Sequence, residues 1–213
     1  MTRLLFVRHG QSVANLERYF AGQIDPALTE LGLRQAECTA EFIAKTYSVD
    51  AVYSSDLQRA YQTGLTASEK LGLPITIDQG LREIFAGVWE GRGFDELAQE
   101  RSPAYVQWHA DIGNAKCPGG ETVAELADRI YEAVCRIAER HPDQTLVLAT
   151  HATPIRTLQW RVSGQDLGHM KDIPWVSNAS VSEFAYENGV LTPVKLSQDA
   201  HLADMKTELP ANI

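Results

Sequence analysis

Short apolar runs alternate along the chain with longer segments in which apolar residues recur at helical spacing. The runs at residues 4–7, 51–55 and 146–149 are typical of strands that are buried on both faces of a parallel sheet. Residues 75–77 form a shorter strand candidate. Near the C-terminus, two strand-like runs flank the dipeptide Asn188-Gly189, which favours a tight hairpin turn. The pattern predicts a mostly parallel sheet with one hairpin near the C-terminus.

The segments between these strands carry helix signals. Thr29 is the predicted N-cap of one helix, and Asp56 is the predicted N-cap of a second helix that ends before Gly72. The clearest helix covers residues 122–140, where the apolar positions Val123, Leu126, Ile130, Val134 and Ile137 recur at helical spacing. A further helix is expected after His151. Strands that alternate with helices in this way indicate an α/β fold.

The middle of the chain is less regular. Residues 84–121 are rich in Gly and Trp, with short helices expected near residues 95–101 and 103–110. No repeat, low-complexity segment or linker interrupts the chain. We therefore expect one domain over residues 1–213, with residues 84–121 as an insertion at the sheet edge that caps the substrate.

Composition and charge narrow the function classes. The chain has 213 residues, and its formal net charge of −9 provides no basic field for nucleic acid or for an anionic membrane. The three cysteines, Cys38, Cys117 and Cys135, lack the spacing of a disulfide framework or a zinc site. The first apolar run is too short for a signal peptide, and no run approaches the ~18 residues of a membrane span. A cytoplasmic protein is expected.

Polar residues follow the predicted strands and point to one catalytic crevice. Arg8 and His9 follow the first strand, and His151 follows the strand at residues 146–149. Arg59 lies in the first turn of the second predicted helix, and Glu83 follows the third strand. In parallel sheets, ligands bind beyond the carboxyl ends of the strands. If these strands are neighbours, the five side chains converge.

This set of side chains suits phosphoryl transfer. Two guanidinium groups can bind the equatorial oxygens of a phosphoryl group in two-pronged fashion. A neutral imidazole such as that of His9 is a nucleophile near pH 7 and would form a phosphohistidine. A carboxylic acid such as Glu83 can protonate the leaving alkoxide and then activate water. A protonated His151 can stabilise the developing charge.

The sequence resembles the histidine phosphatase superfamily, in its phosphoglycerate mutase-like branch, over nearly the whole chain. The matching segments in the first half are Phe6-Val7-Arg8-His9-Gly10-Gln11-Ser12, Asn15, Gly22-Gln23-Ile24-Asp25-Pro26-Ala27-Leu28-Thr29, Gly32, Tyr53-Ser54-Ser55-Asp56-Leu57-Gln58-Arg59-Ala60 and Thr63. The later ones are Leu81-Arg82-Glu83-Ile84, Gly87-Val88-Trp89-Glu90-Gly91, Pro118-Gly119-Gly120-Glu121-Thr122, Thr150-His151 and Asn178-Ala179-Ser180. Arg-His-Gly alone is a weak signal, whereas this ordered series is a strong one.

The resemblance implies a fold and a set of roles. The implied fold is a phosphoglycerate mutase-like α/β fold, a mixed and mainly parallel sheet flanked by helices on both faces. By position, His9 corresponds to the phosphorylated nucleophile and Glu83 to the proton donor. Arg8, Arg59 and His151 correspond to the phosphate pocket, and Asn15 corresponds to a supporting phosphate contact. The family needs no metal, so no metal or other cofactor is expected.

Two positions depart from the family pattern. Many members carry Gly after the second histidine, where this chain has Ala152; its backbone amide can still bind phosphate, but its Cβ crowds the approach. Many phosphatases also carry a polar residue where this chain has Ala21. Gly22 and Gln23 are therefore the candidate phosphate contacts in that segment. His201 also matches a C-terminal family pattern but receives no role.

The sequence is compatible with three functions. A metal-independent phosphatase for a small phosphomonoester is favoured, because residues 84–121 lack the paired arginines with which mutases of this family bind a carboxylate. A bisphosphoglycerate-dependent mutase is one alternative. A non-catalytic protein that binds a phosphorylated ligand is the other. The expected partner is a small phosphorylated metabolite, a homodimer is possible, and the substrate itself stays open.

Overall fold

The computed structural model describes residues 1–207 and shows six strands in one sheet, in the order β3-β2-β4-β1-β5-β6. β1, β2, β3 and β4 are parallel, and β5 and β6 add an antiparallel hairpin beside β1. The strands are β1 (Thr2–Arg8), β2 (Ala51–Ser54), β3 (Ile75–Ile77), β4 (Thr145–Thr150), β5 (Val181–Glu187) and β6 (Val190–Gln198). The predicted mixed, mainly parallel sheet is confirmed.

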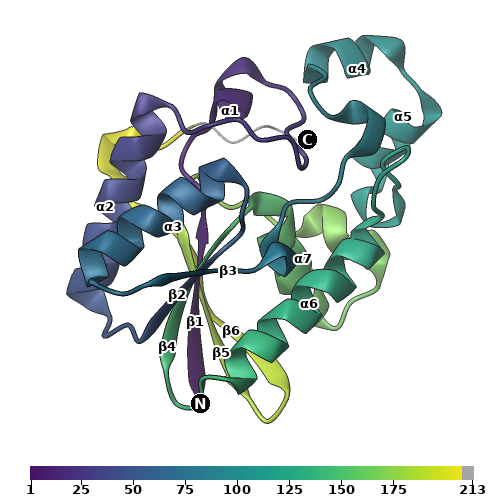
Figure 1. Cartoon of the computed structure of the whole chain (residues 1–213). Helices are drawn as coiled ribbons and strands as arrows, with labels where there is room; N and C mark the ends of the chain where they lie inside the picture. The colour runs from purple at the N-terminus through teal and green to yellow at the C-terminus, as the bar shows by residue number, and fades with distance from the viewer. Residues whose placement is uncertain (208–213) are drawn as a thin grey trace.

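Helices cover both faces of this sheet, with α2 and α3 on one side and α6 and α7 on the other (Figure 1). The α-helices are α1 (Val13–Glu17), α2 (Glu30–Thr46), α3 (Gln58–Leu71), α4 (Phe94–Glu100), α5 (Pro103–Ala110), α6 (Val123–Glu139) and α7 (Ala152–Ser163). Residues 1–207 also contain five 3₁₀ turns, namely η1 (Gln79–Leu81), η2 (Gly87–Trp89), η3 (Ile112–Asn114), η4 (Leu167–Asp172) and η5 (Ala200–Met205). No helix among these residues is both long and apolar enough to cross a membrane.

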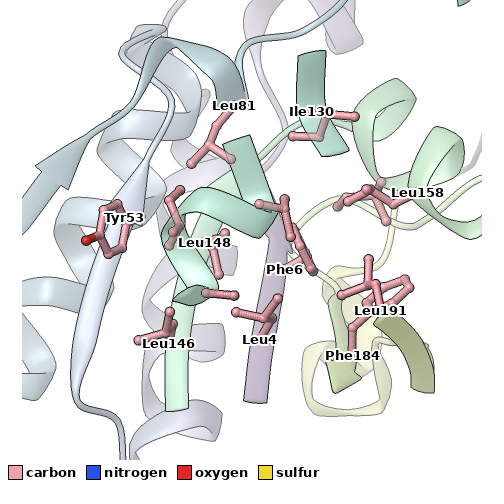
Figure 2. Packing of buried hydrophobic residues seen from close by; sticks show 14 of the residues in the cluster. Leu4, Phe6, Tyr53, Leu81, Ile130, Leu146, Leu148, Leu158, Phe184 and Leu191 are labelled. Atoms are coloured by element: carbon pink, nitrogen blue, oxygen red, sulfur yellow. The ribbon is translucent and has the colours of Figure 1, made fainter. Parts of the chain in front are cut away.

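The core lies on both faces of β1 and β4, because alternate side chains of a strand point to opposite faces. Leu4 and Phe6 pack with Leu146 and Leu148 toward α6 and α7, as Figure 2 shows. Leu5 and its neighbours pack on the opposite face against α2 and α3. The continuous apolar runs of the sequence therefore correspond to strands that are buried on both sides.

Local capping explains where several helices begin. Thr29 caps α2 through a hydrogen bond from Gly32 N, as predicted. α6 begins with a capping box in which Thr122 and Glu125 bind each other's backbone amides. The prediction that Asp56 caps the helix after β2 is wrong. The N-cap of α3 is Leu57, which makes no side-chain capping bond, while Asp56 forms an ion pair with Arg82.

A second core lies in the region between residues 84 and 121. α4 and α5 are short, and their bounds are within one residue of the predicted short helices. They pack around an aromatic cluster in which Phe20 contacts Trp89, Phe94, Tyr105 and Trp108 at ring distances of 5.0–6.4 Å. α4 and α5 lie beyond the carboxyl ends of the parallel strands (Figure 1). Through Phe94 and Trp108, they contribute to the lining of a cavity.

Candidate active site

A cavity of about 640 Å³ opens beyond the carboxyl ends of β1 and β4. The predicted site residues that line it are Arg8, His9, Asn15, Gly22, Arg59, Glu83 and Ala152. His151 is fully buried beside it, with its ring centroid 5.2 Å from that of His9. The register of the sheet explains this meeting, because Arg8 of β1 pairs with Thr150 of β4. His9 and His151 therefore leave neighbouring parallel strands at the same level.

His9 is held in the tautomer that a nucleophile needs. Its Nδ1 lies 2.7 Å from the carbonyl oxygen of Gly10, which can only accept a hydrogen bond. Nδ1 therefore carries the proton, and Nε2 keeps its lone pair. Burial, together with the charges of Arg59 and Arg8, lowers the pKa of His9 well below its ordinary value of 6.5. The imidazole is thus neutral and nucleophilic at physiological pH.

His151 is neutral for the same physical reasons. Burial and the nearby charges of Arg59 and His9 lower its pKa well below 6.5. Its Nε2 lies 3.0 Å from Ser55 Oγ, and Nδ1 has no hydrogen-bond partner among the described residues. Burial and these charges therefore favour the neutral form of His151 over the protonated form expected from the sequence. A bound phosphate dianion would offset the charges of the arginines and favour protonation.

Arg8 and Arg59 place two buried guanidinium groups at the cavity. Arg8 is 5% exposed and donates to the carbonyl of Val176, whereas its buried Nε has no described partner. Arg59 is 1% exposed and donates to the carbonyl oxygens of Gly22 (2.7 Å) and Ile24 (3.0 Å). Burial lowers the pKa of Arg8 to about 10 and also lowers the pKa of Arg59. Both groups are held ready for an anion that would relieve their desolvation.

Glu83 faces the same cavity from the loop after η1. One carboxylate oxygen accepts from Ile84 N at 2.8 Å, and the other lies 3.4 Å from Thr153 N. Arg129 of α6 donates to the backbone carbonyls of Gly80, Arg82 and Glu83 at 3.0–3.1 Å. Arg129 also forms a two-pronged ion pair with Glu121. Glu83 is therefore placed by a clamp that the sequence motifs did not reveal.

Asn15 lines the cavity, and hydrogen bonds from neighbouring residues determine the orientation of its side-chain amide. Its Oδ1 accepts hydrogen bonds from Ser12 N and Ser12 Oγ, and also from Asn178 Nδ2 at 3.1 Å. No residue of 1–207 accepts a hydrogen bond from Asn15 Nδ2, which is left as a donor. Asn178 also donates to the carbonyl of His9 at 3.1 Å. Asn178 thus links Asn15 to His9, a role that its place in the Asn178-Ala179-Ser180 motif did not specify.

The remaining predicted contacts differ in where they lie. Gly22 lines the cavity with a φ of +48°, and a Cβ there would lie 2.2 Å from Glu90 Oε1, so any other residue at this position would be strained. Ala152 lines the cavity as the first residue of α7, where its amide has no acceptor within the helix. Gln23 does not line it. Its side chain contacts Glu83 O and Arg82 instead, and lies in a separate shallow pocket.

Two further features support the loop that carries His9. Gly10 lies against Gly32 of α2, where a Cβ would meet the Gly32 carbonyl oxygen at 2.3 Å, so the loop and the helix touch backbone to backbone. Thr63 of α3 accepts from Gly10 N at 3.1 Å. His201 has a packing role, because it stacks on Phe42 and contacts Thr39. Within residues 1–207, no cluster of three or more His, Cys, Asp or Glu side chains could hold a metal ion.

The sequence of this chain is similar to the sequences of several known proteins. The chain is 36% identical over 157 residues to a bifunctional protein of Mycobacterium tuberculosis, a match that covers 74% of this chain. The chain spans only 43% of the length of that relative. It is 29% identical to phosphoserine phosphatase 1 of Hydrogenobacter thermophilus, with 98% of each chain covered.

A solved structure shares the fold. The mycobacterial glucosyl-3-phosphoglycerate phosphatase, solved in complex with VO3, superposes with a TM-score of 0.84 at 28% identity. The match covers 92% of this chain and 99% of that one. Residues 4–199 also match the model of the histidine phosphatase superfamily (branch 1). Because this match covers nearly the whole chain and its motif residues meet at one cavity, the chain belongs to branch 1 of the histidine phosphatase superfamily.

Proposed function

We propose that this protein is a metal-independent phosphatase that hydrolyses a small phosphomonoester through a phosphohistidine on His9. The observation that carries the proposal is the contact between His9 Nδ1 and Gly10 O. This contact leaves a neutral imidazole with its lone pair on Nε2, at a cavity lined by two buried guanidinium groups. Relatives named as phosphatases support the same reaction.

In the first step, His9 Nε2 attacks the phosphorus atom and the bond from phosphorus to the ester oxygen breaks. Arg8 and Arg59 bind the phosphoryl oxygens, with Asn15 Nδ2, the Ala152 amide and His151 as further donors. Glu83, in its protonated form, gives its proton to the leaving alkoxide. The Gly10 carbonyl stabilises the positive charge that develops on the phosphorylated ring through its bond from Nδ1.

In the second step, water replaces the alcohol. The Glu83 carboxylate removes a proton from this water, whose oxygen attacks phosphorus as the bond to Nε2 breaks. Inorganic phosphate leaves, and His9 returns to its neutral tautomer with the proton still on Nδ1. Each residue returns to its starting protonation state, so one set of groups serves both steps.

We extend the proposal to the organisation of the chain, with residues 1–213 as one catalytic domain and residues 84–121 as the part that caps the substrate. Phe94 and Trp108, from α4 and α5, line the cavity and support this role. Phosphatase chemistry is favoured over mutase chemistry. Besides Arg8 and Arg59, the one arginine that lines the cavity is Arg18, whose side chain is 64% exposed and lies 3.9 Å from Asp95. A buried pair of cations for a substrate carboxylate is not present among these lining residues.

The test measures phosphate release from a panel of phosphomonoesters, including para-nitrophenyl phosphate, without added metal. The wild type is also quenched in alkali, where a phosphohistidine survives and an acyl phosphate does not. His9→Ala should lower kcat by about 10⁵-fold, as the loss of a nucleophile does, and should abolish the trapped adduct. His169→Ala, which changes a half-exposed histidine that does not line the cavity, is the matched control. Equal turnover by His9→Ala and wild type would refute the proposal, and bisphosphoglycerate-dependent turnover far above hydrolysis would indicate a mutase.

A further inference from the structure

Two chemically different sets of side chains line the cavity. The first set, which we call the phosphate end, contains Arg8, His9 and Arg59 together with Glu83. The second set, which we call the aromatic end, contains Tyr19, Phe20, Phe94, Trp108 and Trp175. A volume of about 640 Å³ is in the range of pockets that enclose a small organic ligand, beyond a phosphoryl group alone. The cavity therefore has room for an alcohol group beside the phosphoryl group.

The aromatic end offers little to a charged leaving group. Arg18 is the one further cation that lines the cavity, and it lies in solvent near Asp95. Glu83 is the one lining carboxylate, and the reaction needs it at the ester oxygen. A carboxylate or an ammonium group on the alcohol would lose water against apolar rings without gaining a buried partner, which is unfavourable.

Among these aromatic side chains, Trp175 is stacked on a buried cation. The guanidinium carbon of Arg156 lies 3.9 Å from the centre of its indole ring and covers one face. Arg156 is itself 2% exposed and is held by three hydrogen bonds of 2.7–3.2 Å to the carbonyls of Met170 and Ile173. This buried cation anchors a half-buried indole that lines the cavity, so the ring is oriented before any ligand binds. An oriented aromatic surface binds a planar ring at low entropic cost.

The cation also biases what the indole binds. The negative face of an aromatic ring attracts cations, and Arg156 already occupies that role on one face. Its charge draws electron density toward itself, which weakens the attraction of the other face for a second cation. The attraction between the indole and a planar, uncharged ring is not weakened by Arg156, because such rings stack through dispersion and offset contact.

We propose that the natural substrate is a phosphomonoester whose alcohol carries an uncharged aromatic or planar heterocyclic ring and no carboxylate, with Trp175 as the specificity-determining contact. The inference rests on the proposed phosphatase function and adds the class of leaving group. It separates this chain from relatives named for phosphoserine or for a phosphoglycerate. Arg156 is a positioning residue that acts through Trp175.

The test compares benzyl phosphate with cyclohexylmethyl phosphate, which are similar in size and both release a primary alcohol. Wild-type kcat/KM should be several-fold higher for benzyl phosphate, and on the order of 10-fold higher than for phosphoserine or 3-phosphoglycerate. Trp175→Leu keeps an apolar wall but removes the ring. It should lower the benzyl-to-cyclohexylmethyl ratio by about fivefold, since an aromatic pair contributes roughly 1 kcal/mol beyond its area. The matched control is Trp160→Leu, another half-buried tryptophan that does not line the cavity.

Two outcomes overturn the inference while leaving the phosphatase function intact. One is a wild-type preference for phosphoserine or 3-phosphoglycerate over benzyl phosphate, and the other is an unchanged ratio in folded Trp175→Leu. Calorimetric titration of the two ring esters into His9→Ala measures the preference without turnover. Phosphate release from none of these esters would count against the proposed function, and equal affinities in the titration would then count against the ring preference separately.

Discussion

The phosphate end and the aromatic end of the cavity are built in different ways. Side chains of the phosphate end leave the chain at the carboxyl ends of strands or in the first turn of a helix, and backbone carbonyls hold them. The aromatic end draws on distant segments, with Phe20 after α1, Phe94 in α4, Trp108 in α5 and Trp175 after η4. The sheet determines the first set, whereas packing among the capping elements determines the second. Such a division allows the capping elements to change the leaving group that is accepted without changing the groups that react with phosphorus.

The largest effect in this comparison is expected from a change at Glu83, which the proposed reaction needs at the ester oxygen. Glu83→Gln removes the acid but keeps the shape, so kcat for alkyl phosphates should fall by about 10²- to 10³-fold. Para-nitrophenyl phosphate should lose much less, because its leaving group needs no proton. Rates with esters of graded leaving-group pKa measure this dependence. A loss that followed the ring content of the alcohol instead would mean that the two ends do not act separately.

A smaller effect is expected from the clamp on the Glu83 loop. Arg129→Met removes the hydrogen bonds to the carbonyls of Gly80, Arg82 and Glu83, and kcat for alkyl phosphates should fall by about 10-fold as Glu83 loses its placement. The loss should again be weaker for para-nitrophenyl phosphate, which a general loss of stability would not produce. The benzyl-to-cyclohexylmethyl ratio should stay unchanged, since the clamp does not touch the aromatic end.

Glu121→Gln tests the same clamp from its other member. It weakens the ion pair to Arg129 but leaves the arginine in place, so its effect should have the same leaving-group dependence with a smaller size. Thermal unfolding of both variants controls for folding. An equal loss for alkyl and para-nitrophenyl esters would show that Arg129 stabilises the fold without positioning Glu83.

The smallest effect concerns pH and involves the phosphate end alone. Since burial lowers the pKa of His9 and His151 well below 6.5, both imidazoles should stay neutral as the pH falls from 8 through 6.5. Their NMR signals, assigned with His9→Ala and His151→Ala, should not titrate in that window. The unfolded chain does bind protons there, so the free energy of unfolding should decrease as the pH falls below 6.5. Titration of His9 near pH 6.5 in the free protein would contradict the buried, neutral nucleophile.

Much of the fold was predictable because its signals are local. The buried runs at residues 4–7 and 146–149, the stripe of α6 and the Asn188-Gly189 turn all lie where the structure has β1, β4, α6 and the β5–β6 hairpin. Helix α1 was not predicted, since five residues show too little periodicity. Asp56 was misplaced as a cap because its pairing with Arg82, far along the chain, outweighs a local bond.

The candidate site was predictable to the extent that short motifs encode it. Arg8, His9 and Arg59 lie in recognisable sequence motifs. The prediction that they converge needed the rule for parallel sheets and also the condition that their strands are neighbours, which the pairing of β4 with β1 and β2 meets. Gln23 shows the limit of this reasoning. Its side chain forms hydrogen bonds with Glu83 O and with the Arg82 side chain. No local sequence pattern predicts that Gln23 contacts these residues and does not reach the cavity.

The sequence by itself determined the reacting groups, because strand ends and helix starts place them through short-range geometry. It did not determine the order of the strands. It also did not predict the neutral state of His151, which depends on burial and on the nearby charges of Arg59 and His9. Only the tertiary structure decided the clamp of Arg129 on Glu83 and the stacking of Arg156 beneath Trp175. These contacts join residues that no helical or strand periodicity relates. Short sequence motifs thus specify the reacting groups of the site, whereas contacts between residues far apart in the sequence specify its selectivity.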